Sequence, residues 1–371
     1  MTLAMKTENS MRQALKIGQS FWYDGLISTA EFRRMIEEDG LRGATTNPAI
    51  FEKALAGQEY DSHIQELAKT QNDEEIFKTL AIRAVQEVAT VFLPVYQETR
   101  GLDGYVSLEV SPLLAYDTAA TLREARELWR LVNRSNVMIK IPATREGLPA
   151  IEAALADGIN VNVTLIFSVE RYREVMDAYI QGLQKRAGFD WQVSEIASVA
   201  SFFVSRVDSA VDKILENKIA ASQNTAEKET LKALLGKAAI ANSKVAYEEF
   251  KRVFSGARFQ KLQSKGAILQ RPLWASTGTK NANYSDVLYV ESLIGPDTVN
   301  TMPPATLEAF LDHGISASTI ESEMADAHAA LKNLAAVGID LSSVTQDLEK
   351  AGVEIFCEAY RKIIQRIGAK K

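Results

Sequence analysis

The chain has 371 residues, 46% of them hydrophobic and 24% charged, which is the composition of a folded globular protein and excludes a disordered or fibrous one. The formal net charge of −6 argues against a nucleic-acid or anionic-membrane partner, because such a partner would select a basic surface. No apolar run approaches the roughly 20 residues that a membrane span needs, and the first residues lack the apolar core of a signal peptide, so we expect a cytoplasmic protein.

Short β-rich runs alternate with longer amphipathic helical patterns, an order typical of βα units around a parallel sheet. There are about eight such runs, the number that closes a barrel filled by its own side chains. A doubly wound open sheet remains an alternative. In chain order, the predicted strands are 20–25, 41–47, 105–110, 136–142, 160–167, 195–204, 267–276 and 297–303.

The segments between the strands carry helical periodicity. The helix over 72–92 is typical, because Asn72 or Asp73 can cap its first turn. The helical pattern over about 205–255 is too long for one crossover and predicts a helix followed by an inserted helical hairpin. Residues 305–371 are expected to form helices that close and flank the barrel. Since no linker divides the chain, we expect one domain over 1–371.

The single cysteine, Cys357, cannot form an internal disulfide and lies in a helical pattern, where a buried structural thiol is the expected role. The three histidines, His63, His313 and His328, are scattered along the chain and supply no metal-ligand spacing. We therefore predict no metal site.

Lys140 lies within an apolar strand. Alternation places Val137, Ile139 and Ile141 on the face toward the helix layer and Lys140 on the inward face, near the carboxyl end of the strand, where barrel active sites lie. Desolvation can lower the pKa of a buried lysine by up to ~3–5 units and yield an amine that attacks a carbonyl to form a Schiff base. For Lys140 judged alone, a strand-end lysine that reaches solvent or pairs with a carboxylate is the simpler interpretation.

The neighbouring strands change this judgement. Interiors of barrels are normally filled by branched apolar residues, so several inward polar side chains at strand ends indicate a pocket around Lys140. The residues with the same inward parity are Ser107, Glu109, Asn160, Asn162 and Thr164.

The lysine region resembles one known family. The segments IKIPATREG at 139–147 and GINVNVTLIFS at 158–168 are similar to the Schiff-base lysine region of the transaldolases, and further matching segments follow in the family's order over about 20–300. This resemblance implies a single (β/α)8 barrel, an α/β fold of the TIM type, with additional helices and a helical insertion. The further segments are GATTNPAIF at 43–51, VSLEVSP at 106–112, SFFVSR at 201–206 and WASTGTKN at 274–281, the last of which resembles the longer branch of the family.

The resemblance implies catalytic roles for four residues. Lys140 is the nucleophile that holds the three-carbon unit, Asp24 exchanges the proton of the C4 hydroxyl, and Glu109 is an acid/base that works through a water held by Thr164. Judged alone, Asp24 would be interpreted as a cap or turn residue. A structural ion pair between Glu109 and Lys140 is compatible with catalysis.

The resemblance also implies ligands for the dihydroxyacetone unit. Asn47, whose backbone is biased toward an extended or turn conformation by Pro48, is expected to bind its hydroxyls together with Ser201. Asn162 is expected to help position water or substrate, although it could be satisfied by neighbouring polar groups instead. Phe203 is expected in the pocket wall, where it would exclude water.

The phosphate group of the substrate needs a cationic site. Arg206 offers a planar fork for bidentate contact, and Ser276 with nearby backbone amides can complete the site. Shorter members of the family place an arginine two residues after this serine, where this chain has Gly278. Lys280 is the expected substitute.

Together these residues predict an enzyme that acts on sugar phosphates without a cofactor. The expected reaction is that of a transaldolase, which moves dihydroxyacetone from sedoheptulose 7-phosphate to glyceraldehyde 3-phosphate and yields erythrose 4-phosphate and fructose 6-phosphate. An aldolase of the same superfamily is the nearest rival, and Glu109 argues against it because the related fructose 6-phosphate aldolases carry glutamine there. A sugar-phosphate isomerase and a non-catalytic regulator that binds sugar phosphates are two further candidates. The sequence leaves a monomer or a homodimer open.

Overall fold

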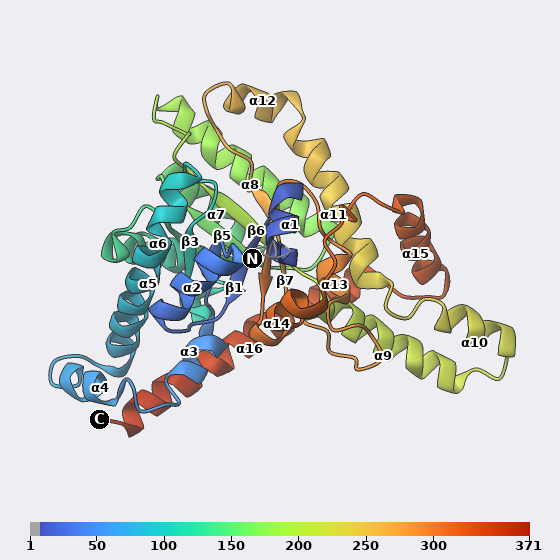
Figure 1. The fold of residues 1–371 in the computed structure, drawn as a ribbon, viewed down its shortest axis with the longest axis horizontal. Coiled ribbons are helices and arrows are strands. Elements are labelled where there is room, and N and C mark those ends of the chain that lie inside the picture. The colour runs from blue at the N-terminus through green and yellow to red at the C-terminus, as the bar shows by residue number, and fades with distance from the viewer. Residues whose placement is uncertain (1–7) are drawn as a thin grey trace, which may run out of the picture.

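The computed structural model describes residues 8–371, so the first seven residues of the predicted domain lie outside the described part. Its centre is a closed barrel of eight parallel strands, each paired with the next in the chain, and β8 paired with β1 (Figure 1). The predicted barrel is confirmed over the open sheet. The strands are β1 (Gln19–Asp24), β2 (Gly43–Thr45), β3 (Tyr105–Glu109), β4 (Val137–Pro142), β5 (Val161–Ile166), β6 (Ser198–Phe203), β7 (Arg271–Ala275) and β8 (Thr298–Met302).

Each strand lies within its predicted run, apart from one residue at the start of β1, but β2, β6 and β7 are clearly shorter than predicted. The predicted run over 267–276 contributes only Arg271–Ala275, because the pairing between β6 and β7 begins where Val199 lies opposite Arg271. The residues just before Arg271 are largely apolar and so resemble a strand, but they precede the first residue pair between β6 and β7. The sequence pattern does not show where this pairing begins.

The helices of the outer layer begin with clear capping signals. In α5 (Asp73–Glu98), the Asn72 Oδ1 accepts from the Glu75 amide at 3.0 Å, and the Glu75 carboxylate accepts from the Asn72 amide at 2.9 Å, so Asn72 is the cap. The other helices of the first half are α1 (Ser10–Ile17), α2 (Thr29–Asp39), α3 (Pro48–Ala54), α4 (Asp61–Leu67), the 3₁₀ turn η1 (Pro112–Leu114), α6 (Thr118–Val132), α7 (Gly147–Ala156) and α8 (Val169–Gly188).

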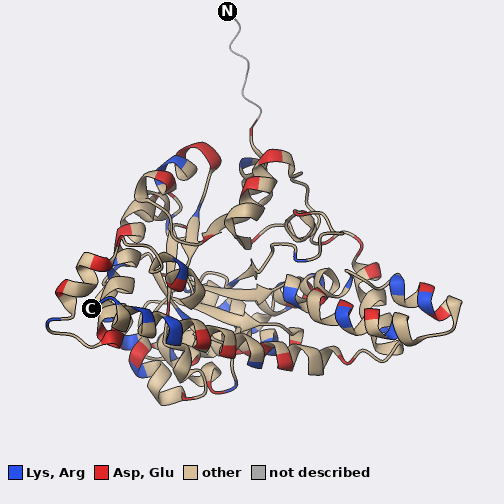
Figure 2. Cartoon of the chain, turned by 90° about the horizontal axis from the view of Figure 1, so that it is seen from below, with Lys and Arg blue, Asp and Glu red and all other residues tan. Residues whose placement is uncertain are grey.

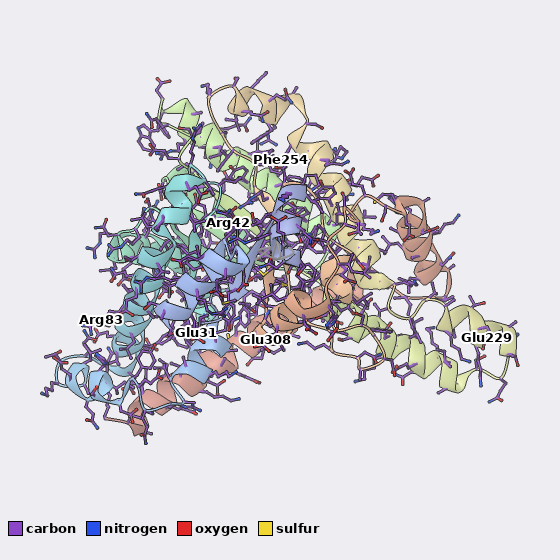
Figure 3. All side chains as sticks on the ribbon, viewed as in Figure 1. Glu31, Arg42, Arg83, Glu229, Phe254 and Glu308 are labelled. Carbon is purple, nitrogen blue, oxygen red and sulfur yellow. The ribbon has the colours of Figure 1, made fainter. Side chains whose placement is uncertain are left out.

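The predicted helical insertion is confirmed. It comprises α9 (Ser205–Ala221), α10 (Thr225–Lys232) and α11 (Ala238–Phe254), followed by the short α12 (Ala257–Gln263). Figure 3 shows Glu229 at the outer end of this insertion, far from the barrel axis. Phe254 anchors the other end, with its ring centre 6.1 Å from that of Tyr179 on α8 and 4.7 Å from that of Phe259.

The last part of the chain is helical, as predicted. The short α13 (Leu288–Glu291) precedes β8, and α14 (Pro304–His313), α15 (Met324–Ala336) and α16 (Leu341–Ala369) follow it. Helix α16 does more than flank the barrel, because it packs against α3, α5 and η1 toward one end and against β5 and α9 toward the other. In Figure 1 it runs beside α3 toward the C terminus. Cys357 lies buried on this helix, as predicted.

The outer surface mixes both signs of charge. Figure 2 shows lysines and arginines interspersed with aspartates and glutamates along the outer helices. Within residues 8–371, no helix combines the length and the apolar character that a bilayer crossing needs. Any strong affinity for an anion must therefore come from a local arrangement of side chains.

Candidate active site

A cavity of about 170 Å³ lies at the carboxyl ends of the barrel strands. Nine of the eleven site residues predicted from the sequence line it, and the other two, Glu109 and Asn162, contact residues that do. The strands and the loops that follow them supply nearly all of the wall, as expected for a barrel enzyme. The lining residues are Asp24, Thr45, Asn47, Lys140, Thr164, Ser201, Phe203, Arg206, Ala275, Ser276, Gly278, Lys280, Thr301, Pro303 and Phe356.

Lys140 points into the barrel, as the alternation of β4 predicted, and is only 4% exposed. Its Nζ donates a hydrogen bond to the carbonyl oxygen of Thr46 at 3.1 Å and lies 3.6 Å from Oε2 of Glu109. The register of the barrel places Glu109 and Asn162 on either side of it. This burial contradicts the simpler interpretation that the lysine reaches solvent, whereas the ion pair with Glu109 is present.

Glu109 is held in an environment that favours its neutral form. Burial raises the pKa of Glu109 to about 7; the positive charge of Lys140 opposes this rise, and the carboxylate of Asp24 adds to it. A separation of 3.6 Å from Lys140 is too long for a hydrogen bond, so Oε2 has no hydrogen-bond partner among residues 8–371. The Oγ1 of Thr164 is likewise buried without a partner in the described chain. A glutamate in this state can both give and take a proton near neutral pH.

Asp24 ends β1 with its side chain in the cavity. Its Oδ1 accepts a hydrogen bond from Oγ1 of Thr45 at 2.8 Å, and Thr45 also contacts the hydroxyl of Thr301 at 2.6 Å. Burial raises the pKa of Asp24, while Lys140 and the Thr45 hydrogen bond lower it. The cap of the following helix α2 is Ser28, so Asp24 is not needed for capping.

Asn162 joins two serines across the barrel interior. Its Nδ2 donates to Oγ of Ser107 at 2.9 Å, and its Oδ1 accepts from Oγ of Ser201 at 2.7 Å. These bonds satisfy Asn162 within the protein, and they fix Ser201 at the cavity wall. A direct contact between Asn162 and a substrate stays a prediction.

Asn160 does not join this group, so the expectation that it converges on Lys140 is wrong. Its Nδ2 donates to the carbonyls of Ser135 and Val137 at 2.9 and 3.2 Å, and its Oδ1 accepts from the amide of Ala197 at 2.9 Å. Two residues along a strand move a side chain by roughly 6.6 Å toward the amino end of the barrel. Parity alone gives the direction of a side chain and not its depth.

Asn47 has the extended backbone predicted for the residue before Pro48, with φ −156° and ψ 170°. Its Oδ1 accepts from the amide of Ile50 at 3.0 Å and so caps α3. The side chain also lines the cavity, and its Nδ2 makes no hydrogen bond to the described residues. The capping bond leaves this amide group free to donate to a ligand.

Two cations face the cavity from elements that follow β6 and β7. Arg206 lies in the first turn of α9, is half-buried, and forms no ion pair with residues 8–371; its guanidinium carbon lies 5.3 Å from the ring centre of Phe203. Burial lowers the pKa of Arg206. Lys280 also lines the cavity, in the loop after β7. Unpaired cations beside the positive end of a helix form a site for an anion.

Ser276 and Gly278 line the cavity together with these two cations. Ser276 holds a left-handed backbone with φ +56°, which is uncommon outside glycine, asparagine and aspartate, and its Oγ lies 3.0 Å from that of Ser205 at the start of α9. At Gly278, a Cβ atom would lie 3.0 Å from Oγ1 of Thr306, which is tighter than usual van der Waals contact. The chain therefore passes close to α14 here, and a cationic side chain at 278 would need more room.

The loop that carries Lys280 is tied to the insertion through α9 and through Gly236, which lies between α10 and α11. The Tyr284 hydroxyl donates to Oδ2 of Asp212 at 2.7 Å, and Oδ1 of Asp212 accepts from the amide of Gly236 at 3.0 Å. Gly236 has φ +68°, and a Cβ atom there would lie 2.9 Å from the Tyr284 ring. The insertion therefore helps to hold the elements of Arg206 and Lys280 together.

The reasoning from sequence missed five lining residues, which are Thr45, Ala275, Thr301, Pro303 and Phe356. Thr45 and Thr301 come from strands whose inward parity could have identified them, since Thr45 precedes Thr46 and Asn47 in a segment already singled out. Phe356 comes from α16 and had no signal, because nothing in a helical pattern predicts which strand ends the helix covers.

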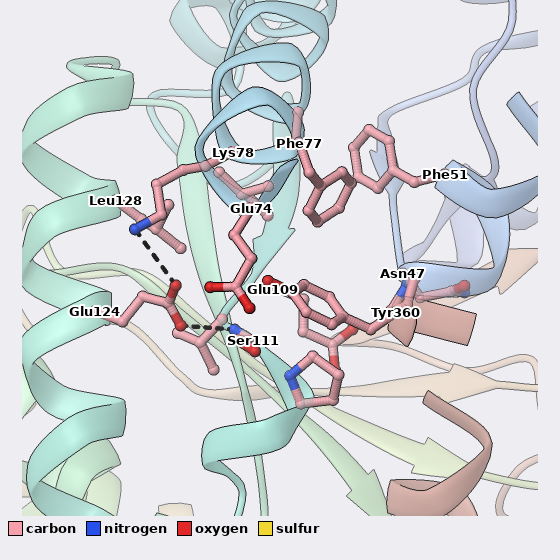
Figure 4. Close-up of a pocket in the computed structure, with 15 residues that line it drawn as sticks. Asn47, Phe51, Glu74, Phe77, Lys78, Glu109, Ser111, Glu124, Leu128 and Tyr360 are labelled. Carbon is pink, nitrogen blue, oxygen red and sulfur yellow. Dashed lines mark hydrogen bonds and ion pairs between the residues drawn. The ribbon is translucent and has the colours of Figure 1, made fainter. Parts of the chain in front are cut away.

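A second cavity of about 40 Å³ lies on the other side of Asn47 (Figure 4). Its volume is a quarter of that of the first cavity and suits a few water molecules rather than a sugar phosphate. In it, Glu124 accepts from the amide of Ser111 at 2.7 Å and pairs with Lys78 at 3.7 Å. Glu109 borders this smaller cavity, but Lys140 and Asp24 line only the larger one, so the larger cavity is the better candidate for catalysis. Within residues 8–371, no cluster of histidine, cysteine, aspartate or glutamate could hold a metal ion.

Comparison with known proteins identifies one family. The model of the family described as transaldolase/fructose-6-phosphate aldolase matches residues 21–367. A transaldolase of Trichodesmium erythraeum is 43% identical over 370 residues, which cover 98% of this chain and 97% of the relative. A transaldolase of Mycolicibacterium smegmatis is 47% identical over 354 residues, 94% of this chain and 93% of the relative. One of Mycobacterium bovis is 45% identical over 374 residues, 98% of each chain.

Proposed function

The chain belongs to the transaldolase/fructose-6-phosphate aldolase family, and we propose that it works as a transaldolase through a Schiff base on Lys140. It transfers dihydroxyacetone from sedoheptulose 7-phosphate to glyceraldehyde 3-phosphate, giving erythrose 4-phosphate and fructose 6-phosphate, in the non-oxidative pentose phosphate pathway. The observation that carries the proposed mechanism is a 4% exposed lysine amine 3.6 Å from a glutamate, in a cavity that Asp24 also lines.

The first step joins enzyme and donor. The amine of Lys140 attacks the C2 carbonyl of the ketose, and the resulting carbinolamine loses its hydroxyl as water to form an iminium ion. Glu109, with a pKa raised to about 7, protonates the departing hydroxyl. The unpaired hydroxyl of Thr164 supports the role predicted for it, which is to hold the water that leaves here and returns in the final hydrolysis.

The second step breaks the bond between C3 and C4. Asp24 takes the proton of the C4 hydroxyl, the electrons of the C3–C4 bond move toward the iminium nitrogen, and an aldose phosphate leaves the enamine on Lys140. The acceptor aldehyde then binds, the enamine carbon attacks it, and Asp24 returns the proton to the new hydroxyl. The raised pKa of Asp24 suits a group that must hold this proton between the two half-reactions.

The dihydroxyacetone unit is bound by polar groups around Lys140. We assign its hydroxyls to the free Nδ2 of Asn47 and to Ser201, which Asn162 orients. Phe203 is 6% exposed in the cavity wall and supports the exclusion of water there. The phosphate is assigned to Arg206, Ser276 and Lys280, with Lys280 as the second cation in place of the arginine of shorter relatives.

The aldolase rival is disfavoured by Glu109, which the related fructose 6-phosphate aldolases replace by glutamine. A sugar-phosphate isomerase would use Glu109 as its base and Lys140 only as an electrostatic partner. Borohydride reduction in the presence of fructose 6-phosphate separates the Schiff-base mechanism from the isomerase, because only a Schiff-base enzyme gains a stable adduct on Lys140. A binding regulator would hold the sugar phosphate and gain no adduct.

The role of Arg206 is tested by its replacement with alanine. We expect the KM for fructose 6-phosphate to rise by about 10-fold to 100-fold, because one charge-assisted contact to the phosphate is lost, while the KM for unphosphorylated fructose changes little. Steady-state kinetics with both donors measure this. Arg83→Ala is a matched control, since Arg83 is exposed on α5 (Figure 3). Equal effects on both donors would move the phosphate site elsewhere.

The pH dependence of the first step follows from Glu109. Since the pKa of Glu109 is raised to about 7, its acid form predominates below this pH and is lost above it. We expect Schiff-base formation, followed by rapid quenching with borohydride, to slow as the pH rises through about 7, and we expect Glu109→Gln to be slower throughout and to lack this transition. A wild-type profile that shows no transition near neutrality would contradict the role of Glu109.

Three further properties belong to the same proposal. We assign the whole chain, residues 1–371, to one domain that acts in the cytoplasm as a monomer or homodimer. It needs no metal or cofactor and no nucleic-acid or membrane partner, in agreement with the mixed surface charge and the net charge of −6. Light scattering of the purified enzyme distinguishes the monomer from the homodimer.

A further inference from the structure

The C-terminal helix α16 forms part of the active-site wall. Its backbone approaches the end of β5 closely at Gly352, where a Cβ atom would lie 2.9 Å from Cδ2 of Leu165. Leu165 itself holds a left-handed backbone with φ +60°, directly after Thr164. One turn beyond Gly352, on the same face of the helix, the side chain of Phe356 enters the cavity.

Helix α16 is fixed on both sides of this contact. Toward its amino end, Glu349 accepts from Nε of Arg171 on α8 at 3.2 Å. Toward its carboxyl end, Arg366 donates to the carbonyl oxygen of Glu52 at 3.2 Å, and Lys370 pairs with Asp61 at 2.5 Å. Interactions with α8, α3 and α4 therefore hold the helix across the barrel mouth.

Aromatic packing fixes the turn after Phe356. The ring centre of Tyr360 lies 5.6 Å from that of Phe77 on α5, and Phe77 lies 5.5 Å from Phe51 on α3, both at nearly perpendicular angles (Figure 4). Edge-to-face contacts of this kind restrict the rotation of each ring. Phe356 is thus presented from a rigid element rather than from a mobile loop.

Phe356 lies over the reacting amine. It is 4% exposed, and its ring centre is 5.9 Å from Nζ of Lys140, within the range in which an aromatic face attracts a cation. The iminium ion formed at this nitrogen carries such a charge. The buried ring also presents an apolar surface to the cavity on this side of the nitrogen.

The enamine on Lys140 has two possible fates. In transfer, its carbon forms a bond to the acceptor aldehyde, whose oxygen takes a proton. In the hydrolytic route, the enamine carbon takes a proton that water carries to it, the iminium ion forms again, one water adds to it, and free dihydroxyacetone leaves while the amine is regenerated. Both routes end with water hydrolysing an iminium ion and freeing the amine of Lys140, but only the second route needs a water that delivers a proton to the enamine carbon.

We propose that Phe356 is a specificity-determining residue, which excludes water from the enamine on Lys140 and thereby favours transfer of dihydroxyacetone over its release. This inference rests on the proposed Schiff-base function. It assigns to the C-terminal helix a part in the choice between transferase and aldolase activity, in addition to the part of Glu109 in the first step.

The test is the ratio of released to transferred dihydroxyacetone. Purified wild type, Phe356→Ala and Phe356→Leu are supplied with fructose 6-phosphate and erythrose 4-phosphate, and free dihydroxyacetone and sedoheptulose 7-phosphate are quantified by NMR. We expect Phe356→Ala to raise this ratio by about tenfold or more, and Phe356→Leu, which keeps an apolar side chain, to restore most of the wild-type value. An unchanged ratio in folded Phe356→Ala overturns the inference.

Ile363→Ala is the matched control. Ile363 is fully buried on the same helix and does not line the cavity, so its truncation loosens the packing of α16 without opening the wall beside Lys140. An equal rise of the ratio in Ile363→Ala would assign the effect to the helix as a whole and overturn the role of Phe356. Borohydride labelling of Lys140 in the wild type tests the Schiff-base function separately from the role of Phe356. If Lys140 is not labelled, the Schiff base itself is refuted.

Discussion

Replacement of Lys140 by alanine is expected to reduce dihydroxyacetone transfer by about 10⁴-fold or more, because no other group can form the covalent link that stabilises the carbanion. The cation site at Arg206 and Lys280 remains intact in this variant, so binding of fructose 6-phosphate should persist. Stopped assays with high enzyme concentrations measure the residual transfer, and calorimetry measures the binding.

The control for this prediction is another buried lysine. Lys244 is 5% exposed on α11 and donates to the carbonyl oxygen of Ser322 at 2.7 Å, away from the cavity. We expect Lys244→Ala to affect stability more than the turnover of folded enzyme. Appreciable transfer by Lys140→Ala would exclude this residue as the nucleophile, whatever the behaviour of the control.

Replacement of Asp24 by asparagine is expected to separate Schiff-base formation from cleavage. The amide cannot take the proton of the C4 hydroxyl, so kcat should fall by about 10²-fold to 10⁴-fold, the usual contribution of a general base. The iminium ion should still form, because Lys140 and Glu109 are unchanged. Borohydride reduction of this variant with fructose 6-phosphate should therefore trap the intact six-carbon phosphate on the enzyme, and mass spectrometry distinguishes it from the three-carbon adduct.

Asp190→Asn is a suitable control for this change. Asp190 is exposed, lies in the loop after α8, and has a left-handed backbone with φ +59°, which asparagine also accepts readily. This variant should yield the same three-carbon adduct as wild type. If Asp24→Asn still cleaved the donor at the wild-type rate, another residue would have to take the proton.

The barrel and the inward position of Lys140 could be predicted because both follow from local periodicity. Alternation along 136–142 gives the direction of Lys140, and adjacent parallel strands then bring Glu109 and Asn162 to its sides. The resemblance to a family added Asp24 and Arg206, which have no distinctive pattern of their own. Their catalytic and binding roles remain predictions that the variants above test.

The height of a side chain along the barrel axis and the packing of distant helices could not be predicted from periodicity. Asn160 has the inward parity of Asn162 but bonds to backbone groups near the amino ends of the strands, since parity does not report height along the barrel axis. Phe356 lies far from Lys140 in the sequence and reaches it only because α16 crosses the mouth. The periodicity of that helix shows an apolar face and does not identify the strands that it covers.

The most direct test is reductive trapping of the wild-type enzyme. Fructose 6-phosphate and borohydride are added together, the protein is digested, and the peptide that contains Lys140 is analysed by mass spectrometry. We expect a three-carbon adduct on the side chain of Lys140 and its loss when borohydride is omitted. An unmodified Lys140 under these conditions, with the donor turning over, would contradict the covalent mechanism.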